Sequence, residues 1–155
     1  MAAFKPSKQI KQDKVAKGKA VEQQDDPRKY YNHKPSWNFS SCDKEQWTFS
    51  HEHAGDAFWS DILPVMKERE AQTWSEILVT EKKKNHTIPP EDLNPLARRR
   101  LVDLFVEAES IVSLRINGTK RLYGYMIGSV FNMLWYDDDH GDNDRCVCRS
   151  TKKHT

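Results

Sequence analysis

Residues 113–140 read SLRINGTKRLYGYMIGSVFNMLWYDDDH, and apolar and polar side chains alternate along most of this stretch. A period of two is typical of β-strands. Asn117-Gly118 is a strong hairpin signal because both residue types tolerate positive φ, and Gly128-Ser129 marks a second turn. The pattern predicts a three-stranded antiparallel meander with strands over 112–116, 119–127 and 130–136.

The third strand of this meander carries apolar residues on both faces. Strict alternation puts Phe131, Met133 and Trp135 on one face, and Val130, Leu134 and Tyr136 on the other. A strand of this kind is central in its sheet or covered on both sides.

Helical signals precede the meander. Asn94 can cap a helix that starts at Pro95 and runs to about Phe105 or beyond. Residues 57–70 have helical periodicity with Pro64 inside, which should kink or divide the helix, and residues 73–76 (TWSE) have capping-box spacing.

The segment before these helices, residues 36–51, has aromatic residues at period two and predicts two short strands or a loose hairpin, whereas residues 81–92 read as a connector. The whole order predicts an α+β fold, with helices packed on an antiparallel sheet that ends in the C-terminal meander.

The N-terminal residues have a different composition. The first twenty residues hold six lysines and one acidic residue, Asp13, although the net charge of the whole chain is only +2. We expect a disordered basic tail over 1–34, with a nucleic-acid-binding arm as the alternative, and one α+β domain over 35–155. The start lacks a secretory signal, no apolar run has the length of a membrane span, and the cysteines number three. These features favour a cytoplasmic protein with reduced thiols.

Cationic and phenolic residues gather on the predicted meander. Arg121, Tyr123 and Tyr125 should share one face of the middle strand, and Arg115 can join them from the neighbouring strand. Guanidinium groups bind phosphate oxygens and tyrosine rings stack on unpaired bases, so this face suits RNA. Lys120 adds another cation. Ordinary cross-strand packing of tyrosines on arginine stems is the alternative.

Residues outside this face could supply the remaining parts of a ribonuclease site. The end of the chain, RSTKKHT, contributes Lys152, Lys153 and His154, and histidine exchanges protons near neutral pH. Glu107 is a candidate carboxylate base, together with Glu109. Arg99, in the arginine run of the predicted helix, could contact phosphate or simply face solvent.

The sequence does not favour a metal or a cofactor. The stretch DDDHGDND does not fit a calcium loop, and Cys146-x-Cys148, with Cys42 and His140, lacks the second cysteine pair typical of a zinc site. A glycine-rich phosphate loop and a nucleophile motif are also missing, so a small-molecule enzyme is not expected.

Several of these motifs resemble those of a family of small bacterial proteins of unassigned function. The shared stretches are TWSEI, LARRRLVDL, the 112–140 run and the final KKHT, and they span about two thirds of the chain. The tyrosine at 136, the aspartate run and the GDNDRCVC stretch depart from that family's usual pattern.

The architecture is also similar to the RelE/ParE toxin superfamily, in which helices precede a three-stranded meander with hairpin arginines and a C-terminal histidine. Ribonuclease members of that superfamily cut messenger RNA on the ribosome. The resemblance implies an RNA- or ribosome-directed protein, with Arg115, Lys120, Arg121, Lys153 and His154 as working residues and a cognate antitoxin as a protein partner. Such a protein could act as a toxin with endoribonuclease activity. The alternative is a non-catalytic interaction or regulatory protein whose basic face binds another protein.

Overall fold

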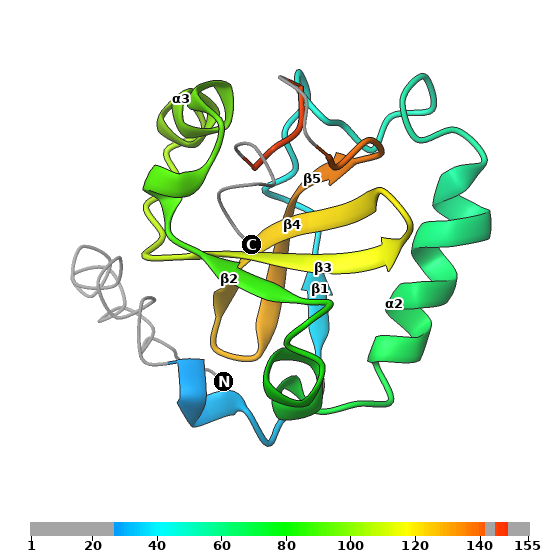
Figure 1. Cartoon of the computed structure of the whole chain (residues 1–155), viewed down its shortest axis with the longest axis vertical. Helices are drawn as coiled ribbons and strands as arrows, with labels where there is room; N and C mark the ends of the chain where they lie inside the picture. The colour runs from blue at the N-terminus through cyan, green and yellow to red at the C-terminus, as the bar shows by residue number, and fades with distance from the viewer. Residues whose placement is uncertain (1–26, 142–144, 149–155) are drawn as a thin grey trace, which may run out of the picture.

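A five-stranded mixed sheet forms the centre of the computed structural model, which describes residues 27–141 and 145–148 (Figure 1). The spatial order of the strands is β1-β5-β4-β3-β2. The strands are β1 (Ser36–Asn38), β2 (His86–Ile88), β3 (Ile111–Asn117), β4 (Lys120–Ile127) and β5 (Val130–Asp137). Together with the helices, this sheet makes the fold α+β, as predicted.

The predicted meander corresponds to β3, β4 and β5, which pair antiparallel in sequence order. Asn117 pairs with Lys120, so the first turn consists of Gly118 and Thr119, one residue later than predicted. Gly118 supplies the positive φ of this turn, at 38°. The second turn lies where predicted, because Ile127 pairs with Val130 around Gly128, whose φ is 62°.

A β-bulge in β5 overturns the predicted alternation of its last residues. Tyr123 pairs with Trp135 and the next residue, Gly124, pairs with Met133, so Leu134 is the extra residue. Tyr136 therefore packs with Phe131 and Met133, and Trp135 packs with Leu134 on the opposite face. The prediction that this strand is central or covered on both sides is confirmed, because β5 lies between β1 and β4 and contributes residues to the apolar clusters on both faces.

The outer strands were predicted less well. Strand β1 forms at its predicted place, but it runs parallel to β5, so the sheet is not purely antiparallel. The second predicted strand, around Trp47 and Phe49, is not a strand, and Trp47 has a φ of 47° that strands do not accommodate. Strand β2 lies in the predicted connector and pairs antiparallel with β3. Its three residues are too few to show a period.

The helices follow their capping and proline signals. Pro64 divides the first helical segment into η4 (Phe58–Ile62), a π-helix, and α2 (Leu63–Arg69). In the capping box before η5 (Glu76–Thr80), the Thr73 N–H donates to Glu76 Oε1 at 2.9 Å and the Glu76 N–H donates to Thr73 Oγ1 at 3.2 Å.

Helix α3 (Pro95–Asp103) begins as predicted, because Asn94 Oδ1 accepts from the Leu96 N–H at 2.8 Å. It ends two residues before Phe105, where φ is 57°. Two 3₁₀ helices, η3 (Pro27–Tyr30) and η6 (Pro90–Asp92), complete the elements.

Two apolar clusters cover the two faces of the sheet. One joins Ile62 and Met66 of the η4–α2 segment, Trp74 and Ile77 to the strands. The other joins Ala97 and Leu101 of α3 and residues 146–148 to the opposite face. Figure 1 shows α2 and α3 on opposite sides of the sheet. In the ranges that the structure describes, no helix is long and apolar enough to cross a membrane.

The folded body begins before the expected boundary at residue 34. The carbonyl groups of Tyr31 and His33 accept hydrogen bonds from the N–H groups of Ser75 and Trp74, each at 2.9 Å. Tyr31 also packs against the first apolar cluster. Residues 27–33 therefore belong with the domain, while residues 1–26 lie outside the described part.

Candidate functional site

The hairpin between β3 and β4 brings Arg115 and Arg121 directly opposite each other. Side chains opposite each other on antiparallel strands have Cβ atoms about 5 Å apart, and like charges in such a pair repel. In the described ranges, neither guanidinium group bonds to a carboxylate, and the Arg115 Nε is buried with no hydrogen-bond partner. The two cations therefore lie side by side without a direct ion pair in the described residues, although Asp137 is the other cross-strand neighbour of Arg121.

Arg121 is fixed by backbone groups of its own turn. Its Nη1 donates to the carbonyl groups of Gly118 and Lys120, at 2.7 and 3.0 Å. The residue is only 8% exposed. Burial, and next the charge of Arg115, lower the pKa of Arg121. The backbone of Arg115 is held in place by its N–H, which donates to the Asn85 side-chain oxygen at 3.0 Å.

The other predicted cations lie in different surroundings. Lys120 forms a 2.6 Å ion pair with Asp61, and this contact raises its pKa. Arg99 is exposed on α3, which covers one face of the sheet. Its neighbour Arg100 instead binds Asp43 through two hydrogen bonds of 2.9 Å, so that residue is a structural link.

Tyr123 does not have the exposed position that we expected. The residue is 0% exposed, so its ring cannot stack on a base. Its side chain belongs to the apolar cluster under α3, which explains the burial. Tyr125 is partly exposed, and its hydroxyl group contacts the Ser41 hydroxyl group at 3.0 Å.

The predicted acid–base residues are not gathered at the arginine pair. Glu107 is exposed in the segment before β3, whereas Arg115 lies close to the opposite end of that strand. The rise from Ile111 to Arg115 alone is about 13 Å at the usual strand spacing. Lys152, Lys153 and His154 lie outside the described residues.

A second polar cluster joins the end of β5 to the C-terminal segment. One ligand-type atom from each of Asp137, His140 and Cys146 lies within 4.8 Å of the other two. Asp137 and Cys146 are buried, and His140 is partly buried. Tyr123 lies beside the group, with its hydroxyl oxygen 3.3 Å from His140 Nδ1 and 3.1 Å from Cys148 Sγ.

Asp137 also organises the backbone around this cluster. Its Oδ2 accepts from the Val147 N–H at 2.9 Å, and its Oδ1 accepts from the Asp139 N–H at 3.0 Å. Burial raises the pKa of Asp137 against the lowering effect of these two bonds. Burial likewise raises the pKa of the Cys146 thiol and brings that of Cys148 to about 12. Such thiols are poor nucleophiles.

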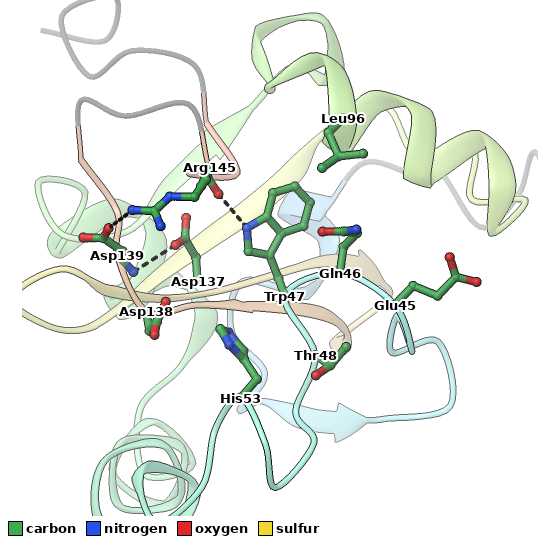
Figure 2. Close-up of a pocket in the computed structure, with 10 residues that line it drawn as sticks. All are labelled: Glu45, Gln46, Trp47, Thr48, His53, Leu96, Asp137, Asp138, Asp139 and Arg145. Carbon is green, nitrogen blue, oxygen red and sulfur yellow. Dashed lines mark hydrogen bonds and ion pairs between the residues drawn. The ribbon is translucent and has the colours of Figure 1, made fainter.

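A cavity of about 680 Å³ opens beside the cluster and shares Asp137 with it (Figure 2). Asp138, Asp139 and Arg145 lie on one side, and Trp47 lies across the middle. The Trp47 indole N–H donates to the Arg145 carbonyl at 2.7 Å, and Arg145 pairs with Asp139 at 3.1 Å.

Sequence reasoning considered a zinc site of Cys146 and Cys148 with Cys42 and His140, and did not favour it because a second cysteine pair is missing. Cys42 is not a member of the cluster, and burial raises the pKa of that thiol to about 11. The signal that was missed is the spacing D-x₂-H-x₅-C at the end of an apolar strand.

No protein-family model matches this chain, and no curated protein or solved structure matches it either.

Proposed function

We propose that this chain is an RNA- or ribosome-directed protein of the RelE-like kind, in which Arg115 and Arg121 bind a phosphate group. The observation that carries this proposal is the direct cross-strand pairing of the two arginines. Two guanidinium groups without a carboxylate partner in the described ranges repel each other, and an anion bound between them relieves that repulsion.

The geometry of the two arginines is suited to a phosphate group. Guanidinium groups offer fixed pairs of donors that match phosphate oxygens. Arg121 is already ordered by the carbonyl groups of Gly118 and Lys120, so little of its side-chain freedom is lost on binding. Contacts to phosphate position a protein on RNA without reading its sequence, and the burial of Tyr123 removes one candidate for base stacking.

RNA cleavage would be an activity in addition to RNA binding. The arginine pair would stabilise the charge that develops on phosphorus, while a separate group moves the proton. Glu107 lies toward the other end of β3 and is a weak candidate for that group. His154 remains the proton-transfer candidate, and the full chain is needed to test it.

A protein partner is the second candidate, and a different surface favours it. Val102 and Phe105, at the end of α3, are 72% and 91% exposed. A cavity of about 690 Å³ is lined in part by Leu104, Phe105 and Tyr125. Exposed apolar side chains beside a hollow are typical of protein–protein contacts, such as that with a cognate antitoxin.

The first prediction tests the arginine pair with Arg115→Ala, because Arg115 makes no side-chain hydrogen bond that folding would lose in the described ranges. Binding of single-stranded RNA should weaken at least about tenfold, since a charge-assisted contact contributes about 1.5–3 kcal/mol. The slope of log K against log salt should fall by about 0.7. Fluorescence anisotropy with a labelled oligonucleotide at several salt concentrations measures both quantities.

Lys34→Ala is the matched control, because it removes one exposed positive charge next to β1, an edge strand that β5 separates from β4. Equal losses of RNA affinity for the two variants would show that binding depends only on net charge and would contradict the proposed site.

If the protein also cleaves RNA, wild-type expression should arrest growth and His154→Ala should relieve the arrest. If the wild type binds RNA but neither arrests growth nor cuts RNA, cleavage is excluded and the binding proposal stands.

A further inference from the structure

The cluster of Asp137, His140 and Cys146 has the composition of a transition-metal site. It offers one carboxylate oxygen, one imidazole nitrogen and one thiol sulfur, all within 4.8 Å of one another. Hydrogen bonds also reach these groups, since the Cys146 thiol contacts the Cys148 carbonyl oxygen at 3.2 Å and His140 Nδ1 at 3.8 Å, but they do not require three different ligand types to meet at one point. The two carboxylate oxygens of Asp137 each accept one backbone N–H, which leaves lone pairs for another partner.

We propose that Asp137, His140 and Cys146 bind a single Zn²⁺ ion that joins the end of β5 to residues 145–148. A thiolate ligand disfavours Ca²⁺ and Mg²⁺, which take oxygen ligands, whereas Zn²⁺ accepts oxygen, nitrogen and sulfur together. This site is independent of the proposed phosphate site, since it uses other side chains.

The spacing of the donor atoms is close to what zinc requires. Bond lengths of about 2.0–2.3 Å in a tetrahedral complex place neighbouring ligand atoms about 3.4–3.8 Å apart. The separation of 3.8 Å between Cys146 Sγ and His140 Nδ1 already falls at this limit. The other ligand atoms are at most 4.8 Å apart, and rotation of the side chains can shorten these distances to the values that zinc requires.

The charges around the cluster are compatible with a divalent cation. Asp137 is 1% exposed and forms no ion pair in the described ranges, although Arg121 is its cross-strand neighbour. Zn²⁺ with one carboxylate and one thiolate is neutral, so the site would not repel that arginine. Asp138 and Asp139 line the cavity that shares Asp137. Their carboxylates would attract a cation toward the cluster.

Metal binding is measured on the full, untagged chain, stripped with a chelator and then titrated with Zn²⁺ or Co²⁺ alone. We expect one ion per chain, a higher melting temperature with Zn²⁺, and a thiolate-to-cobalt charge-transfer band with Co²⁺. Excess Mg²⁺ or Ca²⁺ should not displace the ion. Failure of the wild-type chain to bind Zn²⁺ stoichiometrically would overturn the proposal.

Two variants test the cysteine and histidine ligands, and a third serves as a control. Cys146→Ser and His140→Gln should each weaken Zn²⁺ binding at least about tenfold, in line with the loss of a metal contact. His140 is partly exposed, so its variant reports on the site even if Cys146→Ser does not fold. Cys42→Ser is the matched thiol control and should bind as the wild type does. Unchanged binding by His140→Gln, or loss of binding by Cys42→Ser, would contradict the assigned ligands. RNA binding should be intact in His140→Gln, which separates this site from the phosphate site.

Discussion

Single residues show how far a side chain's role depends on its burial. Tyr123 and Tyr125 both lie on the cluster under α3, but only Tyr123 is fully enclosed there. Its hydroxyl group contacts His140 and Cys148, so it supports the end of β5 and cannot reach a ligand in solution. Arg100 changes role in the same way, because Asp43 binds its guanidinium group.

Asp43 is the clearest structural charge in this molecule. Its side chain is 0% exposed and accepts hydrogen bonds from Arg100 and from the Trp135 indole N–H. We expect Asp43→Asn to destabilise the fold by about 3–5 kcal/mol, the usual cost of breaking a buried pair. Urea unfolding at pH 7 measures this free energy.

The same pair predicts a dependence on pH. Burial alone would raise the pKa of Asp43, but the hydrogen bonds from Arg100 and its other donors lower it below the ordinary value. The pair should stabilise the fold above the unfolded pKa, about 3.9, and lose this effect as pH falls through the folded pKa. The difference in unfolding free energy between the wild type and Asp43→Asn should therefore become smaller at acid pH.

Glu45→Gln provides the control for this pair. Glu45 also contacts Arg100, at 3.2 Å, but its side chain is 71% exposed. Its loss should change stability by less than about 1 kcal/mol. A loss as large as that of Asp43→Asn would mean that burial does not decide the strength of these pairs.

At the scale of elements, the bulge in β5 decides which aromatic side chains face which helix. The extra residue, Leu134, turns Trp135 toward α3 and Tyr136 toward the opposite cluster. Gly124 pairs with Met133 beside this irregularity. A Cβ atom at Gly124 would lie 2.3 Å from the Asn132 carbonyl oxygen and 2.7 Å from the Phe131 ring.

We therefore expect Gly124→Ala to destabilise the fold by about 3 kcal/mol, because backbone would have to move in the middle of the sheet. Thermal unfolding followed by circular dichroism measures the loss. Gly118→Ala is the comparison: its Cβ atom meets nothing within 4 Å, and only its φ of 38° is unfavourable. That change should cost about 1–2 kcal/mol. A smaller loss for Gly124→Ala than for Gly118→Ala would contradict this account of the bulge.

At the scale of the whole molecule, the ends of the described chain lie against its middle. Residues 31–33 accept hydrogen bonds from the start of the η5 segment, and Asn94 donates its N–H to the Val147 carbonyl at 2.8 Å. Sheet order places β1 next to β5 and β2 next to β3, so both outer strands depend on segments far away in sequence.

This arrangement predicts the outcome of N-terminal truncation. A chain that starts at residue 35 loses the acceptors for the Trp74 and Ser75 N–H groups and the packing of Tyr31. We expect a loss of about 2–4 kcal/mol in unfolding free energy. A chain that starts at residue 27 keeps these contacts and should melt close to the full-length protein. Equal melting temperatures for both truncations would return the domain boundary to residue 34.

The sequence by itself determined the features that depend on neighbouring residues. Glycine turns, the Asn94 cap, the capping box at 73–76 and the division at Pro64 all arise from contacts within a few positions. These local signals were enough to predict the meander and the α+β fold class. The pairing of Arg115 with Arg121 did not follow from the turn alone, because a register shift between Arg115 and Asn117 places Arg121, and not Leu122, opposite Arg115.

Only the tertiary structure decided the features that join distant segments. The parallel pairing of β1, the strand at His86–Ile88 and the bulge at Leu134 depend on backbone partners that no local pattern specifies. The same holds for the cluster of Asp137, His140 and Cys146, because the spacing of these residues in the sequence does not say whether their ligand atoms converge. Burial, too, was set by the packing of α3 and residues 146–148, and it made Tyr123 part of the core.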